Sequence, residues 1–192
     1  MGCGLRGLHA DRCGRCTVQP PPWSRLVCAV DYAFPWDRMV ADLKFHAQVD
    51  RAGLLATLLE RAVRGAGPNA AASPPLVVPV PLSRSRLRER GFNQAWEIAR
   101  RTARRLGLQA QPDVLARPVD TVHQGPLARE ARAVNLRGAL MVEPRQARRV
   151  AGRHLAVVDD VFTTGATAAE AVRALRQAGA ASVEIWAVAR TP

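Results

Sequence analysis

The stretch from His154 to Gly179 constrains the fold of this chain more than any other part of it. Residues 155–158 (Leu-Ala-Val-Val) form an apolar run with no polar face, which is typical of a strand in a parallel sheet covered on both sides. Asp159 and Asp160 end that run. Apolar residues then recur at helical spacing as far as Gly179, which predicts a helix that ends in a glycine cap. The predicted order is strand, acidic pair, short turn and helix.

The turn between this strand and this helix has the composition of a phosphate-binding loop. Its residues are Thr163, Thr164, Gly165, Ala166 and Thr167. Glycine allows the backbone to approach a ligand closely, and threonine hydroxyls add donors beside the free N–H groups of a helix N-terminus. The preceding carboxylates accept hydrogen bonds from vicinal hydroxyls or bind a hard cation. Together these groups predict a sugar phosphate ligand; the alternative is that the acidic pair only ends a strand and the threonines only cap a helix.

The string VVDDVFTTGAT resembles the phosphoribosyl diphosphate (PRPP) binding motif of type I phosphoribosyltransferases. In that motif an acidic pair holds the ribose hydroxyls and a Thr-Gly loop holds the 5′-phosphate. The resemblance implies that Asp159 and Asp160 are the ribose-binding pair at the catalytic centre. It also implies that residues 163–167 bind the 5′-phosphate.

The other segments alternate between strand and helix patterns. Strands are predicted at 27–34, 76–80 and 182–188, and helices at 36–64, with a break near 48–50, and at 92–106. Alternation with short links predicts an α/β fold with a right-handed, doubly wound parallel sheet of the type I phosphoribosyltransferase kind. This main domain is expected at residues 26–192, after a short cysteine-containing segment at 1–25.

Arginine crowds the connection that follows the strand at 76–80. Arg84, Arg86, Arg88 and Arg90 precede Gly91 there. Guanidinium groups beside a strand end can grip a phosphate or a pyrophosphate with two hydrogen bonds each. We therefore interpret Arg84, Arg88, Arg90 and Gly91 as a pyrophosphate loop; the alternative is a solvated basic loop.

The chain carries a net charge of +12, and Lys44 is the only lysine among its 28 basic residues. Such a charge indicates a polyanionic partner such as DNA, several phosphate contacts, or only a solvated arginine surface. We interpret Lys44 as an ordinary surface lysine on an amphipathic helix; the alternative is an ammonium near a phosphate site. Four arginines of the helix at 92–106 are interpreted as its solvent-facing side: Arg100, Arg101, Arg104 and Arg105.

Cysteines gather near the start of the chain. Cys13-Gly-Arg-Cys16 is a C-x-x-C pair, which in a cytosolic protein binds metal more often than it forms a disulfide. A zinc site needs four ligands; Cys3 is a third candidate and His9 a fourth. We predict a zinc knuckle at Cys3, Cys13 and Cys16; the alternative is a damaged or absent site.

Missing motifs exclude several classes of protein. The chain has neither the G-x-G-x-x-G pattern of dinucleotide-binding folds nor the G-x-x-x-x-G-K pattern of P-loop proteins. Residues 1–14 lack the apolar region of a signal peptide, and residues 65–83 contain too many prolines and glycines to span a membrane. We therefore expect a cytoplasmic protein without a membrane span.

A second resemblance covers nearly the whole chain. The string VPVPLSRSRLRERGFNQA, then Gln124, Leu127, Arg129, Arg132 and Asn135-Leu-Arg-Gly138, then the acidic motif, are similar in order and spacing to the ComF family. Members resemble phosphoribosyltransferases and are associated with natural competence and uptake of transforming DNA. The resemblance implies that residues 117–137 form a hood over the ligand, in which Arg129 and Arg132 close on the diphosphate.

The same resemblance implies Mg²⁺ as the cofactor of PRPP, and displacement of pyrophosphate from C1 of the ribose by a nitrogen base that no sequence feature identifies. Three functions stay open: a phosphoribosyltransferase of nucleotide salvage, a non-catalytic nucleotide sensor, and an accessory protein that binds single-stranded DNA or a helicase-like competence partner. Family members usually begin with two Cys-x-x-Cys pairs. Here Cys3 would be the later member of the first pair, so either the start is truncated or the zinc finger has degenerated. The sequence makes no prediction of oligomeric state.

Overall fold

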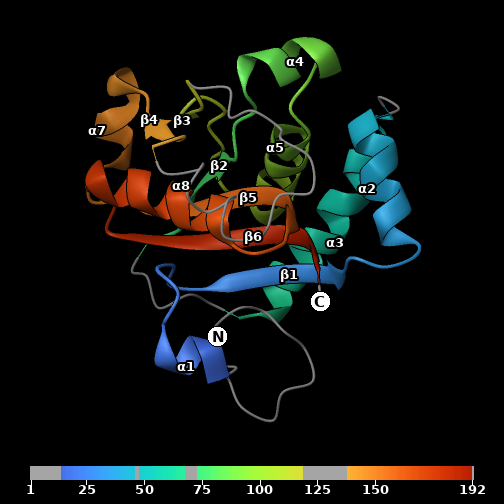
Figure 1. Ribbon diagram of the computed structural model, residues 1–192, viewed down its shortest axis with the longest axis horizontal. Coiled ribbons are helices and arrows are strands. Elements are labelled where there is room, and N and C mark those ends of the chain that lie inside the picture. Colours follow the sequence, from blue (N-terminus) through green and yellow to red (C-terminus); the bar gives the residue numbers. More distant parts are fainter. Residues whose placement is uncertain (1–13, 46–47, 68–72, 119–137, 192) are drawn as a thin grey trace.

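The computed structural model describes residues 14–45, 48–67, 73–118 and 138–191 (Figure 1). Its centre is a sheet of four parallel strands in the order β1-β6-β5-β2. The strands are β1 (Leu26–Asp31), β2 (Leu76–Pro79), β5 (His154–Phe162) and β6 (Ser182–Arg190). The α/β fold with a parallel sheet, which the alternating sequence pattern predicts, is confirmed.

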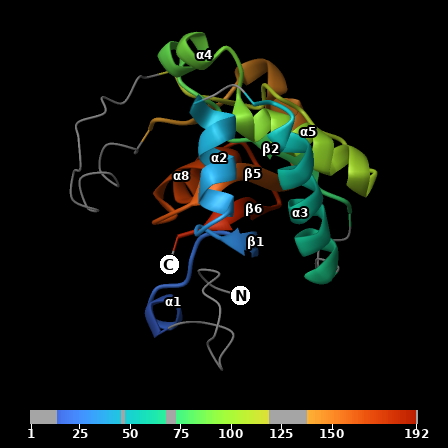
Figure 2. The same cartoon turned by 90° about the vertical axis from the view of Figure 1, so that its right-hand side faces the viewer.

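β5 lies inside the sheet, between β6 and β2. Val158 pairs with Pro79 on one side, and Asp159 pairs with Ala187 on the other. The strand is buried continuously from His154 to Val158, because helices cover both faces of the sheet (Figure 2). This double cover is the physical reason for the apolar run without a polar face.

The helices divide between the two faces. α8 (Ala166–Gln177) covers one face, whereas α2 (Trp36–Phe45), α3 (Arg51–Gly65) and α5 (Gln94–Leu106) lie on the other (Figure 2). Two hydrophobic cores result. One joins Leu175 of α8 to Val157 of β5, and the other joins Ile98 of α5 to Val158, the next residue along the strand. Because successive strand residues point to opposite faces, a single strand contributes to both cores.

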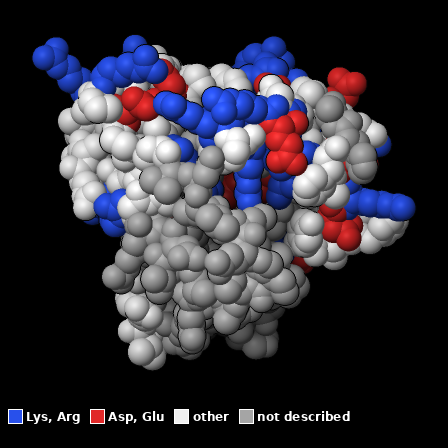
Figure 3. All heavy atoms as spheres, turned by 45° about the horizontal axis from the view of Figure 1, so that its top comes forward, with Lys and Arg blue, Asp and Glu red and all other residues white. Residues whose placement is uncertain are grey.

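The arginine-rich connection is a helix and not a loop, which corrects the sequence interpretation. α4 (Arg84–Arg90) begins after Ser83, whose hydroxyl accepts a hydrogen bond from the N–H of Arg86, and it ends at Gly91, where φ is 79°. A serine N-cap, residues that favour helices and a glycine at the end are sufficient local signals for such a helix. Figure 3 shows basic side chains along the upper edge of the molecule, the side on which α4 lies in Figure 1.

Other predicted boundaries differ by a few residues. The break expected near 48–50 falls between α2 and α3, as predicted. β1 ends at Asp31 instead of residue 34, because Asp31 pairs with Arg190, where the partner strand β6 also ends. The remaining elements were not predicted: α1 (Gly14–Val18), the antiparallel pair β3 (Leu115–Ala116) and β4 (Met141–Val142), the 3-10 helix η1 (Pro144–Gln146) and α7 (Ala147–Val150).

Across the described ranges, every helix is too short or too polar to cross a membrane.

Candidate functional site

The carboxyl end of β5 carries the two aspartates, whose side chains lead toward different covering helices but stay within electrostatic reach of each other. Asp159 is half-buried and lines a pocket on the side of α8. Asp160 is only 4% exposed and faces Lys44 of α2, which covers the other side. The two carboxylates stay connected, because Asp159 Oδ1 accepts a hydrogen bond of 2.9 Å from the backbone N–H of Asp160.

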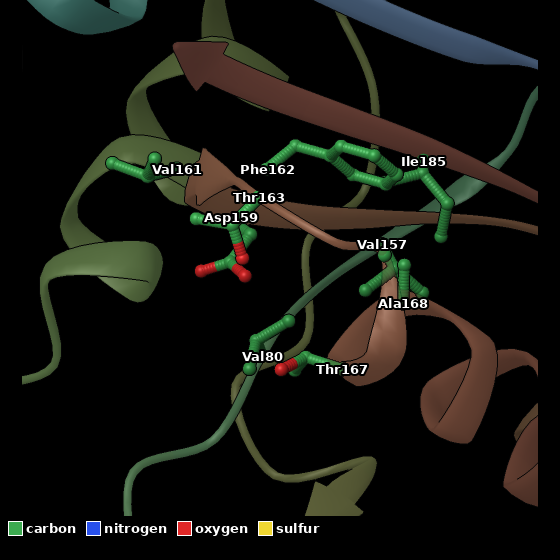
Figure 4. A pocket seen from close by; sticks show the side chains of 10 residues that line it. Val80, Val157, Asp159, Val161, Phe162, Thr163, Thr167, Ala168 and Ile185 are labelled. Atoms are coloured by element: carbon green, nitrogen blue, oxygen red, sulfur yellow. The ribbon is translucent and has the colours of Figure 1, made fainter. Parts of the chain in front are cut away.

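The pocket beside Asp159 has an empty volume of about 320 Å³, part of it open to solvent. Its apolar lining comes from β5, β6, α8 and Val80, which follows β2, and its polar lining comes from Asp159, Thr163 and Thr167. The carboxylate of Asp159 and the hydroxyl of Thr167 lie on different sides of this space (Figure 4). The structure therefore brings the predicted acidic residue and the predicted phosphate loop together around one pocket.

Apart from that of Ala166, the turn leaves the first helical N–H groups of α8 available to a ligand. Its N-cap residue is Gly165, which has no side chain to cap the helix, and Thr164 Oγ1 accepts only from the N–H of Ala166, at 3.3 Å. Thr163 and Thr164 are exposed, and Thr167 is half-buried in the pocket. N–H groups, hydroxyls and the positive end of a helix dipole converge here, which is an arrangement suited to an anion.

The rings of Phe162 and Trp23 form what we call the aromatic floor of this turn, and they leave room only for glycine at its centre. Gly165 has a φ of 82°, and a Cβ atom built on it would lie 2.8 Å from Phe162 Cζ and 3.0 Å from Trp23 Cη2. The two rings are in edge contact, with centroids 5.5 Å apart. Arg190 lies over the Phe162 ring and donates a hydrogen bond of 3.1 Å to the carbonyl of Thr163. Sequence reasoning missed both Trp23 and Arg190, since nothing in their local sequence ties them to the turn.

Lys44 is part of the site, contrary to its interpretation as an ordinary surface lysine. Its Nζ lies 2.9 Å from Asp160 Oδ1, and its side chain is 23% exposed. The other oxygen of this carboxylate, Asp160 Oδ2, is buried and has no hydrogen-bond partner among the described residues. A signal was present in the sequence, because Lys44 is the only lysine of the chain.

Charge around the acidic pair is finely balanced. Burial raises the pKa of Asp159 to about 7, and the charge of Asp160 adds to this, whereas Lys44 and Arg117 pull the pKa downward. Burial also disfavours the charged form of Arg90 and lowers its pKa, whereas the negative charge of Asp160 acts in the opposite direction. The two neighbouring carboxylates, of which Asp159 lines the pocket, therefore lie within the influence of three cationic side chains, a setting typical of ligand sites.

The predicted pyrophosphate loop is divided by the structure. Arg90, at the end of α4, lies near Asp160 and over the ring of Phe45, with 5.7 Å between its guanidinium carbon and the ring centroid. Arg84 and Arg88 are exposed on the same helix. Gly91 ends the helix and so sets where Arg90 lies. Of the arginines of this group, Arg90 has the closest connection to the acidic pair.

Two predicted groups fall partly or wholly outside the described residues. Arg129 and Arg132 of the hood are outside, and so are Cys3 and Cys13, while Cys16 is buried on α1. Within the described ranges, no three cysteine, histidine or acidic side chains are close enough together to hold a metal. The hood contacts and the zinc knuckle stay predictions.

One anchor at the described end of the hood segment was missed. Glu170 of α8 is 5% exposed, and its Oε1 accepts a hydrogen bond of 2.7 Å from the N–H of Gly138. Arg173 donates to both oxygens of the same carboxylate. This contact ties the chain at Gly138 to the helix that begins at the phosphate turn.

This chain has relatives among known proteins. No family model matches the chain. The DNA utilization protein YhgH of Escherichia coli is 38% identical over 191 residues, which is 98% of this chain and 82% of that protein. Competence protein F of Haemophilus influenzae is 33% identical over 195 residues, 98% of this chain and 84% of that protein.

Among solved structures, TT1426 from Thermus thermophilus matches 73% of this chain and 83% of its own, at 19% identity and a TM-score of 0.42, a likeness too weak to argue from. The curated relatives carry more weight, because each matches nearly the full length of this chain at 33% identity or more. The chain belongs to the ComF family.

Proposed function

We propose that this chain binds PRPP, or a closely related ribose phosphate, at the carboxyl end of β5. One observation carries the proposal: a single pocket is lined by the Asp159 carboxylate, an acceptor for hydroxyls, and by Thr163, Gly165 and Thr167, whose hydroxyls and N–H groups are donors for a phosphate (Figure 4). A ribose 5-phosphate presents these two kinds of group on one small molecule.

The acidic pair also fits a magnesium ion that accompanies such a ligand. Asp159 and Asp160 supply carboxylate oxygens, the ligands that Mg²⁺ prefers, and the buried Oδ2 of Asp160 lacks a partner in the part of the chain that the structure describes. When bound, Mg²⁺ would neutralise charge on the diphosphate. Arg90 and Lys44 bring fixed positive charge to the same place. Their role is to attract and orient an anionic ligand.

Calorimetry with PRPP and Mg²⁺ tests this proposal. We expect binding by the intact chain, and a loss of about tenfold in affinity in Asp160→Asn, because an amide cannot supply the carboxylate charge that hydroxyls and metal require. The matched control is Asp50→Asn, since Asp50 is exposed and its side chain makes no cap hydrogen bond. Absence of PRPP binding, or equal affinity in Asp160→Asn, would remove the assignment.

Pyrophosphate release in the presence of a panel of nitrogen bases separates a transferase from a sensor. A transferase releases pyrophosphate with at least one base, through stabilisation of the departing charge by groups such as Arg90. A sensor binds PRPP and releases none. The names of the relatives, DNA utilization protein and Competence protein F, support a setting in competence and DNA use for either activity.

A second candidate function is binding of single-stranded DNA on α4. Arg84 and Arg88 are exposed, and among the described residues neither makes an ion pair or a side-chain hydrogen bond. By contrast, Arg100 and Arg101 of α5 are both paired with Glu97. Guanidinium groups without an internal partner are those available to phosphates. The structure thus favours α4 over this part of α5 as the polyanion surface.

Fluorescence anisotropy with a labelled single-stranded oligonucleotide tests the second function. Reversal of Arg84 and Arg88 to Glu should weaken binding about tenfold or more near 0.15 M salt and reduce its salt dependence. Reversal of Arg100 and Arg101, which are paired with Glu97 on α5, changes the net charge equally and is the control. Excess PRPP should leave most DNA binding intact. Equal losses in the two double variants would show that net charge alone is responsible.

A further inference from the structure

The contact between Lys44 and Asp160 joins two layers of the fold. Lys44 lies in the last turn of α2, and Asp160 lies at the end of the central strand. The distance of 2.9 Å between Nζ and Oδ1 is that of a charge-assisted hydrogen bond. Asp160 is 4% exposed, so the carboxylate is held away from water and depends on its protein partners.

That carboxylate is satisfied on one side only. Asp160 Oδ2 is buried and has no hydrogen-bond partner within the described ranges. Buried carboxylate oxygens are rarely left in this state, since an unmade hydrogen bond to a charged group costs about 1–3 kcal/mol or more. Asp159 is the preceding residue of the strand and adds a second carboxylate. The oxygen without a partner therefore marks a place where an additional donor or cation belongs.

We propose that Lys44 is an internal cation that occupies part of a divalent-cation position at Asp159 and Asp160, and that it leaves Asp160 when a metal-bearing anionic ligand binds. This inference rests on the proposed ribose phosphate site and adds what controls its access to metal. With the ammonium in place, a bare divalent ion meets less negative charge and an occupied carboxylate oxygen. Metal binding then depends on the ligand that arrives with it.

The exposure and the flexible side chain of Lys44 suit such an exchange. Its side chain is 23% exposed, so the ammonium has a route to solvent, and an ammonium on a four-carbon stem is a mobile point charge. Its place in the last turn of α2 keeps it near the negative end of a helix dipole wherever it points. When an anionic ligand enters, a phosphate oxygen offers the ammonium a new partner in place of the carboxylate.

The first test uses Mn²⁺ alone, with the loss of the free-ion electron paramagnetic resonance signal as the readout. Lys44→Met keeps an unbranched side chain that is one atom shorter and removes the charge. We expect Lys44→Met to bind Mn²⁺ at least about tenfold more tightly than the wild-type chain, because the acidic pair loses its competing cation. Lys44→Arg keeps the charge and should stay near wild type. The gain should vanish in Lys44→Met combined with Asp160→Asn.

Arg51→Met is the matched control, since it removes one positive charge at the start of α3, 4.0 Å from Asp42 and in no contact with Asp160. It should leave Mn²⁺ binding unchanged. Equal Mn²⁺ affinity in wild type and Lys44→Met, with circular dichroism showing both folded, would overturn the inference.

The second test uses PRPP with Mg²⁺, and here we expect Lys44→Met to lower the affinity instead of raising it. Lys44→Met should bind PRPP about threefold to tenfold more weakly, because the phosphate loses the ammonium that it would receive. A lysine that only holds the fold would not improve one affinity and weaken the other. If PRPP does not bind the wild-type chain while Lys44→Met gains Mn²⁺ affinity, the proposed function fails and the internal cation stands. If PRPP binds but the Mn²⁺ gain is absent, the internal cation fails alone.

Discussion

Buried charged side chains lie near both ends of β5, but only at one end do both oxygens of the buried carboxylate have partners among the described residues. At the amino end, Glu184 of β6 is 1% exposed; one of its oxygens accepts a hydrogen bond of 3.0 Å from Arg25, and the other lies 3.2 Å from His154 Nε2. At the carboxyl end, Asp160 has Lys44 on one oxygen and, among the described residues, no partner on the other. The first arrangement is complete without a ligand and stabilises the sheet. The second is incomplete, as expected of a binding site.

The two ends also differ in the direction of their pKa shifts. Burial by itself would raise the pKa of Glu184, but the hydrogen bond with His154 and the charge of Arg25 outweigh it and hold the pKa below the ordinary 4.5. Burial and the charge of Asp160 instead raise the pKa of Asp159 to about 7. Ionisation of Glu184 therefore stabilises the fold, whereas ionisation of Asp159 opposes it.

The largest expected effect on stability is at the amino end of β5, where both oxygens of Glu184 have partners. Glu184→Gln should lower the free energy of unfolding by about 3 kcal/mol near pH 7, because it leaves the partly buried Arg25 without its counter-charge. Urea unfolding measures this. Glu60→Gln breaks an exposed pair with Arg64 on α3 and should cost less than about 0.5 kcal/mol. Equal small effects in both variants would mean that the amino end is not the stabilising end.

The pH dependence of the Glu184 contribution follows from its lowered pKa. A carboxyl with a depressed folded pKa contributes stability above its unfolded pKa and loses it as the pH falls through the folded value. The difference between wild type and Glu184→Gln should therefore be constant above about pH 5 and shrink below the ordinary value of 4.5.

An intermediate effect is expected at the phosphate turn. Gly165→Ala should destabilise the chain by about 2 kcal/mol, because the positive φ is strained for alanine and its Cβ would lie 2.8 Å from Phe162. Gly152→Ala is the control for the φ strain alone, since Gly152 has a φ of 70° with nothing within 4 Å of its added Cβ. A difference between the two variants measures the aromatic floor. Identical melting temperatures would show that the aromatic floor moves aside for the added Cβ at no measurable cost in stability.

The smallest effect has the opposite sign. Asp159→Asn should stabilise the ligand-free chain in EDTA by about 1 kcal/mol at pH 8, the remainder of the pKa shift after allowance for the partial exposure of this side chain. Since the folded pKa is raised, the folded state binds the proton more tightly, and wild-type stability falls as the pH rises from about 4 through about 7.

The stabilisation by Asp159→Asn should therefore shrink from pH 8 to pH 5 and disappear near pH 4. Thermal unfolding at several pH values checks this, with Asp50→Asn as the exposed control. A loss of stability at pH 8 would place Asp159 among the satisfied groups and remove the contrast between the two ends.

Local patterns determined the central strand, the turn and the helix that follows it. The apolar run at 155–158, the acidic pair and the glycine of the turn each act through neighbouring residues, so β5 and α8 could be predicted from sequence. α4 had equally local signals in Ser83 and Gly91, and its interpretation as a loop gave too much weight to the charge of its arginines. Predicting α4 as a helix would have required no tertiary information.

Other features depend on residues that are far apart in the chain. Strand order β1-β6-β5-β2 places Trp23 below Gly165 and α2 beside Asp160, and no local pattern encodes either contact. The sequence by itself determined that two carboxylates and a threonine-glycine turn follow one buried strand. Only the tertiary structure decided that one carboxylate faces the pocket while the other is held by Lys44, because the partner on each face of a sheet is set by which helix packs there.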